Sequence, residues 1–224
     1  MTAQPAQARV PLSRERVLAT AVAIADEHGI DAVTMRRVAD ELGAEAMSLY
    51  HHVANKGDLL DGAVDRVVGE VNQAVDALAH DDDWKQGVRT RILTARAVLL
   101  RHRWAPRVLE TRTALSPNVV RYHDRLVGLL RAGGFSHDLI HHALHALGSR
   151  ALGFSQELFD PGSGGTPGPL PPELAGDVPH LLAMLQEVVH DDPGSTIGWC
   201  DDQTEFEFGL DLLLDGLERR RAAP

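Results

Sequence analysis

Residues 29–60, GIDAVTMRRVADELGAEAMSLYHHVANKGDLL, decide how the chain is interpreted. Apolar residues in the first half of this stretch recur at i, i+3, i+4 and i+7, which predicts a short helix with one buried face. These residues are Met35, Val38, Ala39 and Leu42. Thr34 stands where a helix N-cap is needed, and Gly43 stands where a glycine ends a helix. A preceding helix is expected over 13–28, with Ser13 as its N-cap and Gly29 as a left-handed stop.

A second helix is predicted directly after this glycine, because Gly43-Ala44-Glu45 has the length of a helix-turn-helix corner. Leu49 and Val53, four apart, face inward. The outward face carries small residues, a hydroxyl and imidazoles, where an ordinary surface helix carries glutamate and lysine. Its residues are Ala46, Met47, Ser48, His51 and His52, with Tyr50 at the edge.

Such a face suits a DNA groove. Small side chains permit close approach to base edges, and Ser, Tyr, His and the following Lys56 can bond phosphates or bases. Spacing alone leaves an alternative open, in which the stretch is a three-helix packing unit without a ligand.

The same stretch resembles the DNA-binding domain of TetR-family transcriptional regulators. The matching residues are Thr34, Arg36, Val38, Ala39, Leu42, Gly43, Leu49, Tyr50, His52, Val53, Asn55, Lys56 and Leu59. The resemblance implies a helix-turn-helix unit that binds double-stranded DNA at a palindromic operator. The DNA contacts are expected from Thr34, Met35, Arg36, Ala46, Met47, Ser48, Tyr50, His51, His52 and Lys56.

The composition fits this interpretation. Aromatic residues make up 4% of the 224, while Leu, Ala and Val are abundant and alternating strand-like runs are absent, which favours an all-α protein of about ten helices. The single cysteine, Cys200, excludes a disulfide framework within one chain and suits a cytoplasmic location. No apolar run approaches the roughly 20 residues of a membrane span, so we expect no membrane partner.

The net charge of −10 does not exclude a DNA partner. Residues 1–60 hold six Arg or Lys and eight Asp or Glu, which leaves −2 there and −8 in the remainder. What matters is the charge around the binding face, where Arg9, Arg14, Arg16, Arg36, Arg37 and Lys56 are expected to gather.

The expected organisation has three parts. Residues 1–12 form a disordered lead-in, 13–60 the DNA-binding domain, and 61–224 a helical effector-binding and dimerisation domain. Its helices are expected near 57–79, up to 101, at 103–112, 117–132, 136–158, 179–189 and 201–221. Residues 161–177, with five Gly and five Pro, are expected to form a flexible loop.

The last predicted helix is apolar on two sides, so we expect it to pack on its own chain and on a second copy. In TetR-family proteins the corresponding helices form a dimer interface. The residues expected at a homodimer interface are Gly148, Gly153, Phe206, Leu210, Leu213 and Leu217.

Residues 84–158 resemble the effector domain of the tetracycline-repressor subgroup, which implies a small-molecule effector. Three drug-binding positions of those repressors fall here on Asn72, Arg91 and Leu109, so we do not expect tetracycline as the ligand. A mostly apolar pocket with few polar groups is expected, suited to a hydrophobic molecule with one or two hydrogen-bonding or anionic groups. Its expected lining is Arg91, Leu99, Leu109, Tyr122, Leu126, Leu129, His142 and His145.

Three alternatives remain at this point. His137, His141 and His145 repeat every four residues, a spacing that suits a metal-responsive regulator, although we expect no metal and no cofactor. A DNA-binding protein without an effector is the second alternative. A helical enzyme is the third, but the sequence has no Ser-His-Asp signature, phosphate-binding glycine loop or H-E-x-x-H motif.

Overall fold

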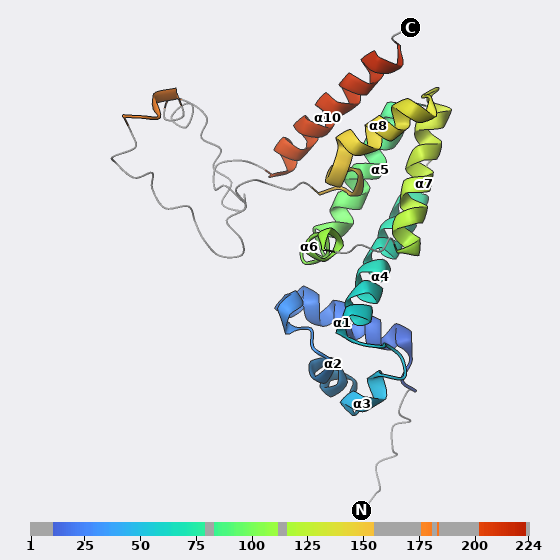
Figure 1. Ribbon diagram of the computed structural model, residues 1–224, viewed down its shortest axis with the longest axis vertical. Coiled ribbons are helices and arrows are strands. Elements are labelled where there is room, and N and C mark those ends of the chain that lie inside the picture. Colours follow the sequence, from blue (N-terminus) through green and yellow to red (C-terminus); the bar gives the residue numbers. More distant parts are fainter. Residues whose placement is uncertain are drawn as a thin grey trace, which may run out of the picture. The chain divides into compact units, whose positions relative to one another are not determined.

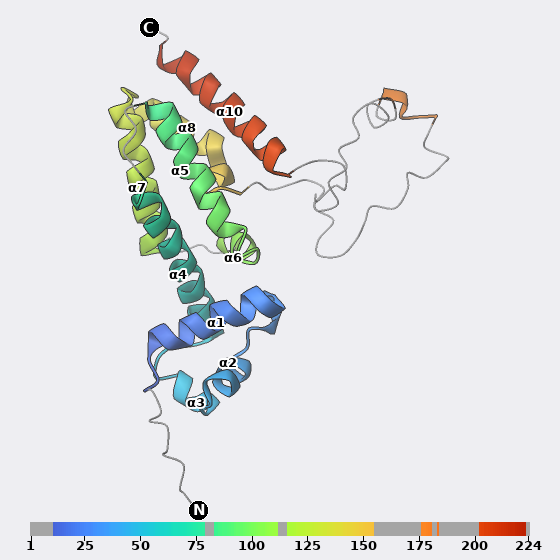
Figure 2. The ribbon, with the colours of Figure 1, turned by 180° about the vertical axis from the view of Figure 1, so that it is seen from behind.

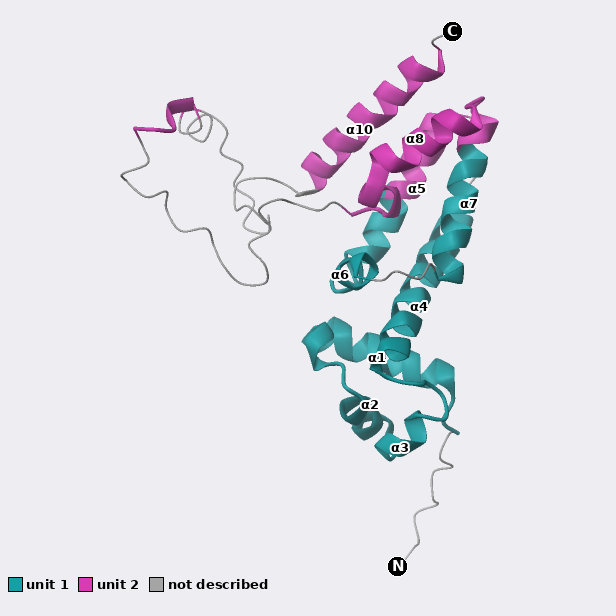
Figure 3. Ribbon diagram, in the orientation of Figure 1, with its two compact units in different colours: residues 1–80, 93–129 teal, residues 81–92, 130–224 magenta. Residues whose placement is uncertain are grey.

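The computed structural model describes residues 11–78, 83–111, 116–154, 176–180, 183 and 202–222. All regular secondary structure in these ranges is helical, which confirms the all-α prediction (Figures 1 and 2). The chain divides into two compact units. One comprises residues 1–80 and 93–129, and the other comprises 81–92 and 130–224 (Figure 3). None of the described helices is both long enough and apolar enough to span a membrane.

The first unit begins with the helix-turn-helix elements. They are α1 (Arg14–His28), the 3-10 turn η1 (Ile30–Ala32), α2 (Met35–Leu42) and α3 (Ala46–Leu49). The predicted caps form: the Ser13 side chain accepts from the Arg16 N–H, and the Thr34 side chain accepts from the Arg37 N–H.

Two glycines end helices here, but in different conformations. Gly43 has φ 62° and ψ 35°, the left-handed conformation that glycine adopts most easily, and it turns the chain from α2 into α3. Gly29 has φ 80° but ψ 162°, so the expected left-handed stop after α1 is wrong in detail. The η1 turn begins at the next residue, Ile30.

The long helix α4 (Lys56–Asp76) follows the helix-turn-helix elements within the same unit and packs against α1. Its buried stripe includes Val64, Val67, Val71 and Val75. The C-terminal part of α5 (Trp84–Leu99), together with α6 (Ala105–Glu110) and most of α7 (Pro117–Ala132), completes the first unit.

Polar contacts fix α7 beside α4. The Asn118 backbone N–H and side-chain amide both donate to the Asp65 carboxylate, at 3.0 Å each. The Asn72 amide donates to the Asn118 carbonyl at 3.0 Å, and Arg125 pairs with Asp76 one turn further along. The start of α7 is therefore held against the middle of α4.

The second unit contains the N-terminal half of α5, α8 (His137–Leu147), the 3-10 turn η2 (Gly148–Leu152) and α10 (Asp202–Arg221). Charged side chains of α5 pair with carboxylates of α10: Lys85 with Asp215, and Arg89 with Glu207 and Asp211. These contacts raise the pKa of Lys85 and of Arg89, in each case chiefly through the hydrogen bond that the side chain donates to an aspartate. Trp84 extends the same row by donating its indole N–H to Glu218 at 2.9 Å.

The helix expected over 136–158 is shorter than predicted, because α8 ends at Leu147. Gly148 follows at φ 50° and ψ −127°, and Gly153 ends η2 in the left-handed conformation. Gly148 therefore ends α8 and Gly153 ends η2, and their place at a homodimer interface stays a prediction. Smaller differences are that α4 ends at Asp76 and α5 at Leu99.

Several predictions fall outside the described residues. These are the lead-in before residue 11, the glycine- and proline-rich loop apart from its last two residues, most of the helix expected over 179–189, and Cys200.

Candidate nucleic-acid interface

The predicted recognition segment is one helical turn that tightens toward its C-terminal end. After Ala46–Leu49, the Tyr50 and His51 N–H groups bond carbonyls three residues back, at 3.3 and 3.4 Å. The His52 and Val53 N–H groups both bond the Leu49 carbonyl, at 2.8 and 2.9 Å. Because Leu49 and Val53 are almost fully buried, these contacts fix which side of the segment faces outward.

The exposed side carries the residues predicted to contact DNA. Met47 is 71% exposed and Tyr50 is 47% exposed, both high for large apolar or aromatic side chains. His51 and Lys56 are also exposed, while Ala46 and His52 are partly covered. Four of these six residues are therefore exposed and two are partly exposed, and their contact with DNA stays a prediction.

The predicted contact residues at the start of α2 differ in how accessible their side chains are. Thr34 is exposed, but its hydroxyl is occupied as the helix cap, and Met35 is partly buried. The Arg36 side chain is 89% exposed, with its guanidinium 3.9 Å from Asp40 on the next turn. Arg36 is thus the α2 side chain best placed to reach a phosphate.

A groove of about 630 Å³ runs beside the start of α3. Pro11, Leu12 and Arg16 line one side, and the α2–α3 corner lines the other. Ser48 lies in this groove and is only partly exposed, so its hydroxyl is less accessible than Met47 or His51.

An ion pair that the sequence did not predict holds this surface to α1. The Arg14 guanidinium contacts the Asp58 carboxylate at 2.6 and 3.0 Å and donates to the His52 carbonyl at 2.7 Å. Asp58 also accepts from the Ala54 N–H at 2.8 Å. The Asn55 side chain caps α4 by accepting from the Asp58 N–H.

Arg14 and Asp58 are 44 residues apart, so no local pattern could have paired them. The hydrogen bond from Arg14, followed by that from Ala54, lowers the pKa of Asp58, and the Asp58 carboxylate raises the pKa of Arg14. The pair fixes the end of the recognition segment at the point where α4 begins.

The residues predicted to line an effector pocket do not all face inward. In the first unit Leu99, Tyr122 and Leu126 are buried, and Leu109 and Leu129 are partly buried. In the second unit Arg91 is buried.

His142 and His145 are exposed, which corrects their assignment to the pocket. The physical reason is the helix period: Ile140, Ala143 and Leu147 take the inner face of α8 and leave the histidines outside. The His141 and His145 rings lie edge to face at 4.6 Å. In the part of the chain that the structure describes, no three His, Cys, Asp or Glu side chains are grouped to hold a metal ion.

The residues predicted at a dimer interface need a similar correction. Phe206, Leu210 and Leu217 are buried within the chain's own second unit, and Leu213 is partly buried. The guanidinium of Arg150 lies over the Phe206 ring and within about 3.1 Å of where a Cβ on Gly209 would sit. The exposed apolar residues of α10 are Phe208 and Leu212, at 61% and 55%.

Two family models match this sequence. Residues 17–63 match the one described as bacterial regulatory proteins, tetR family, and residues 78–221 match the one described as tetracyclin repressor-like, C-terminal domain. The HTH-type transcriptional repressor DrrR1 of Streptomyces coeruleorubidus is 31% identical over 92% of this chain and 77% of its own length. An HTH-type transcriptional regulator of Saccharopolyspora erythraea is 36% identical over 55% of this chain, and the match spans about half of that relative (51%).

Two solved structures show a similar fold. A possible TetR family transcriptional regulator from Streptomyces coelicolor has a TM-score of 0.74 at 34% identity, covering 92% of this chain and 99% of its own. The TetR family protein ActR of the same species, solved in complex with (S)-DNPA, has a TM-score of 0.72 at 29% identity, covering 95% and 100%.

The Arg14–Asp58 pair gives a prediction about acid stability. Because the pKa of Asp58 is lowered in the folded chain, its stabilising contribution is present above the ordinary pKa of an aspartate and is lost as the pH falls below about 4. Asp58→Asn should lower the free energy of unfolding by about 1 kcal/mol or less at neutral pH, since both side chains are partly solvated. The free energy of unfolding of Asp58→Asn should also fall less steeply than that of the wild type as the pH is lowered.

Urea unfolding at several pH values measures both effects. Asp31→Asn, an exposed carboxylate of the same unit, is the control and should follow the wild type. Identical acid profiles for Asp58→Asn and the wild type would show that the pair contributes nothing.

Proposed function

The chain belongs to the TetR family of bacterial transcriptional regulators, and we propose that it is a homodimeric repressor that a small molecule releases from a palindromic operator. The observation that supports the proposal most directly is the exposed face of the recognition segment. Met47, Tyr50, His51 and Lys56 project from a turn that is fixed on its other side by buried Leu49 and Val53. A short, rigid turn with small and hydrogen-bonding side chains outward fits the major groove of B-DNA.

In the proposed complex, the exposed residues divide into two groups. Met47 and His51 face base edges, with Ser48 reaching them from the groove beside α3. Tyr50, Lys56 and Arg36 contact phosphates, which position the protein but carry no sequence information.

Release by an effector follows from the course of α4. This helix begins at Lys56, beside the recognition segment, and its middle is tied to α7 through Asn118. A ligand that shifts α7 or the helices around it moves α4, and with it the recognition segment. Two such segments must match the spacing of two half-sites, so a shift of a few ångströms abolishes binding.

The effector is proposed to be an organic molecule. ActR, the similar protein solved with (S)-DNPA bound, supports a small-molecule ligand, and the buried Leu99, Tyr122 and Leu126 supply apolar surface for one. Arg91 is the proposed partner for an anionic group. No catalytic activity is part of the proposal, and the proposed location is the cytoplasm.

The first prediction concerns how DNA is read. Tyr50→Phe and Lys56→Ala should weaken binding to every sequence, and Lys56→Ala should lower the salt slope of the association constant by about one unit. Met47→Ala, Ser48→Ala and His51→Ala should change the preferred operator, which operator selection from a random duplex library measures. Arg220→Ala, an exposed arginine of α10, is the control. Identical selected sites for the three variants of the base-facing residues would exclude base reading by this face.

The second prediction concerns assembly. Leu212→Glu should give a folded monomer, because an exposed carboxylate is tolerated in one chain but must lose its water in a dimer contact. Operator affinity should fall with it, since one half-site alone provides too little binding energy. Sedimentation velocity gives the oligomeric state, and Thr204→Glu, on an exposed position of the same helix, is the matched control. If Leu212→Glu sediments as an intact dimer, the exposed side of α10 is not the interface.

The third prediction concerns the effector. Release from the operator should not require a divalent metal, because Leu109 replaces the metal-anchoring position of the tetracycline repressors. A compound screen for operator release, run with and without EDTA, tests this. Arg91→Met should weaken the binding of anionic effectors more than the binding of neutral ones. Operator release that strictly requires zinc or magnesium would contradict the proposal that the effector binds without a metal.

A further inference from the structure

His102 occupies the turn between α5 and α6 and touches two carboxylates from different helices. Its Nδ1 lies 2.8 and 3.0 Å from the two Asp26 carboxylate oxygens, and its Nε2 lies 3.2 Å from Glu70 Oε2. The Trp104 indole N–H donates to the same Asp26 carboxylate at 2.7 Å. We call Asp26, Glu70, His102 and Trp104 the α1–α4 clasp.

The imidazole is the buried member of this cluster. His102 is 7% exposed, whereas about a third of the surface of the Asp26 and Glu70 side chains is exposed. A neutral imidazole has one N–H and one bare nitrogen, and a carboxylate can only accept hydrogen bonds. Both contacts of His102 are therefore favourable only when both ring nitrogens carry protons.

The clasp joins the elements that carry the DNA-binding surface. Asp26 lies in the last turn of α1, the helix against which α2 and α4 pack. Glu70 lies in α4, which starts at the recognition segment. His102 and Trp104 belong to the corner that precedes α6, and α6 packs on α4. All four residues lie in the first unit.

We propose that His102 is a positioning residue for operator binding: doubly protonated, it holds the last turn of α1 to α4, and it releases one of the two when a ring proton is lost. The inference rests on the proposed DNA-binding function. The positioned element is α1, because it supports α2 and is joined through Arg14 to the end of the recognition segment. Operator affinity should therefore fall as the pH rises from about 6 to about 8.

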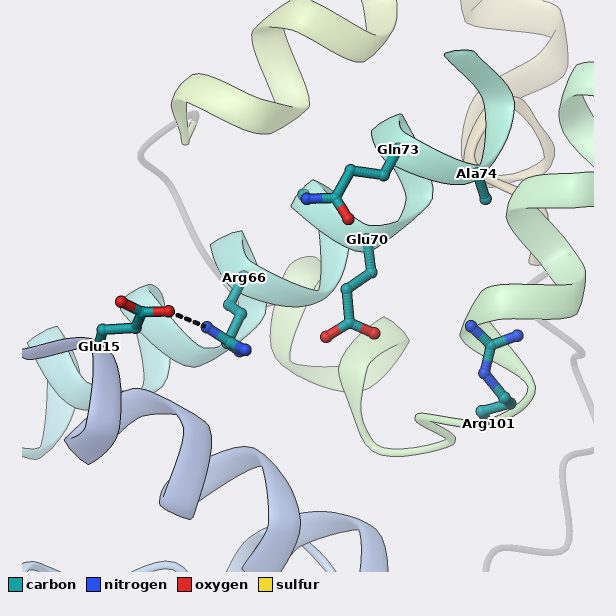
Figure 4. A pocket seen from close by; sticks show the side chains of 7 residues that line it. Glu15, Arg66, Glu70, Gln73, Ala74 and Arg101 are labelled. Carbon is teal, nitrogen blue, oxygen red and sulfur yellow. Dashed lines mark ion pairs between the residues drawn. The ribbon is translucent and has the colours of Figure 1, made fainter. Parts of the chain in front are cut away.

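A depression of about 760 Å³ lies on the Glu70 side of the clasp. Figure 4 shows Glu70 and Arg101 at this depression, with Arg66 paired to Glu15 of α1. The charged groups that contact the ring are Asp26 from α1 and Glu70 from α4, and Glu15, Arg66 and Arg101 line the depression beside Glu70. Because the Glu70 contact, at 3.2 Å, is longer than the Asp26 contacts at 2.8 and 3.0 Å, the Glu70 contact is the one that a lost proton breaks.

Glu70→Gln provides a sharp test because it preserves size and changes one chemical property. A carboxylate only accepts, whereas the glutamine side chain can accept from an N–H or donate its own N–H to a bare ring nitrogen. The variant should keep its contact with His102 in both protonation states. Glu15→Gln is the matched control, since it removes a carboxylate from the same depression without touching the clasp.

The measurement is operator affinity of the full chain at about pH 6 and about pH 8, with a duplex obtained by selection. His51 and His52 of the candidate DNA-binding surface are present in every variant, so the comparison between variants isolates the clasp. Wild type and Glu15→Gln should lose about fivefold more affinity across this range than Glu70→Gln. Parallel profiles for wild type and Glu70→Gln would overturn the proposal.

Thermal unfolding without DNA separates this failure from failure of the proposed function. The unfolding midpoint of wild type should fall relative to that of Glu70→Gln as the pH rises, because the folded wild type loses a contact that the variant keeps. If no operator is bound at any pH but this difference appears, the DNA-binding proposal is wrong and the clasp is pH-sensitive. If operator binding is intact and the difference is absent, the role assigned to His102 is wrong.

Discussion

A four-residue helix does not hold its shape alone, and the DNA-binding surface of this protein depends on such a helix. Forming one helical turn fixes several backbone angles in return for a single hydrogen bond, so isolated short helices are unstable in water. The α3 turn is therefore held from outside: Leu49 and Val53 are buried beneath it, and Gly43 sets its direction. Arg14 bonds the carbonyl at its end. Its outer face can then be chosen for DNA, because none of its stability has to come from that face.

The same constraint explains the structure of α4. Its first turn must complete the support of the recognition segment, so Asn55 caps it and Asp58 receives Arg14. Its middle must respond to the effector domain, so Asp65 and Asn72 are used for contacts with α7. The Asn72 side-chain amide donates to the Asn118 carbonyl, so this polar side chain serves the packing of α7 on α4.

The sequence predicted those parts of the fold that short-range chemistry determines. Ser13 and Thr34 cap helices by accepting hydrogen bonds from backbone N–H groups three residues further along the chain, and Gly43 reverses the chain locally. Each of these features can therefore be predicted from a short stretch of sequence. Contacts between distant residues were not predictable in this way. The pairs Arg14–Asp58 and His102–Asp26 join residues 44 and 76 positions apart, and each residue alone is an ordinary charged side chain. The histidines of α8 were assigned to a pocket because their chemistry suited it, but the helix period turned them outward.

The candidate DNA-binding surface carries charges of both signs, which makes the orientation of the recognition segment important for binding. Arg36, Arg37 and Lys56 are exposed, but so are Asp40 and Glu41 of α2 and Glu45, the residue before α3. Those opposed charges limit the number of phosphates that the exposed cations can neutralise, so binding that ignores sequence is weak. In the proposed dimer, specific affinity then comes from direct contacts at two half-sites, and those contacts form only when both recognition segments are correctly oriented. The proposed repressor is therefore sensitive to small changes in the supports of α3, and this sensitivity allows an effector to control it.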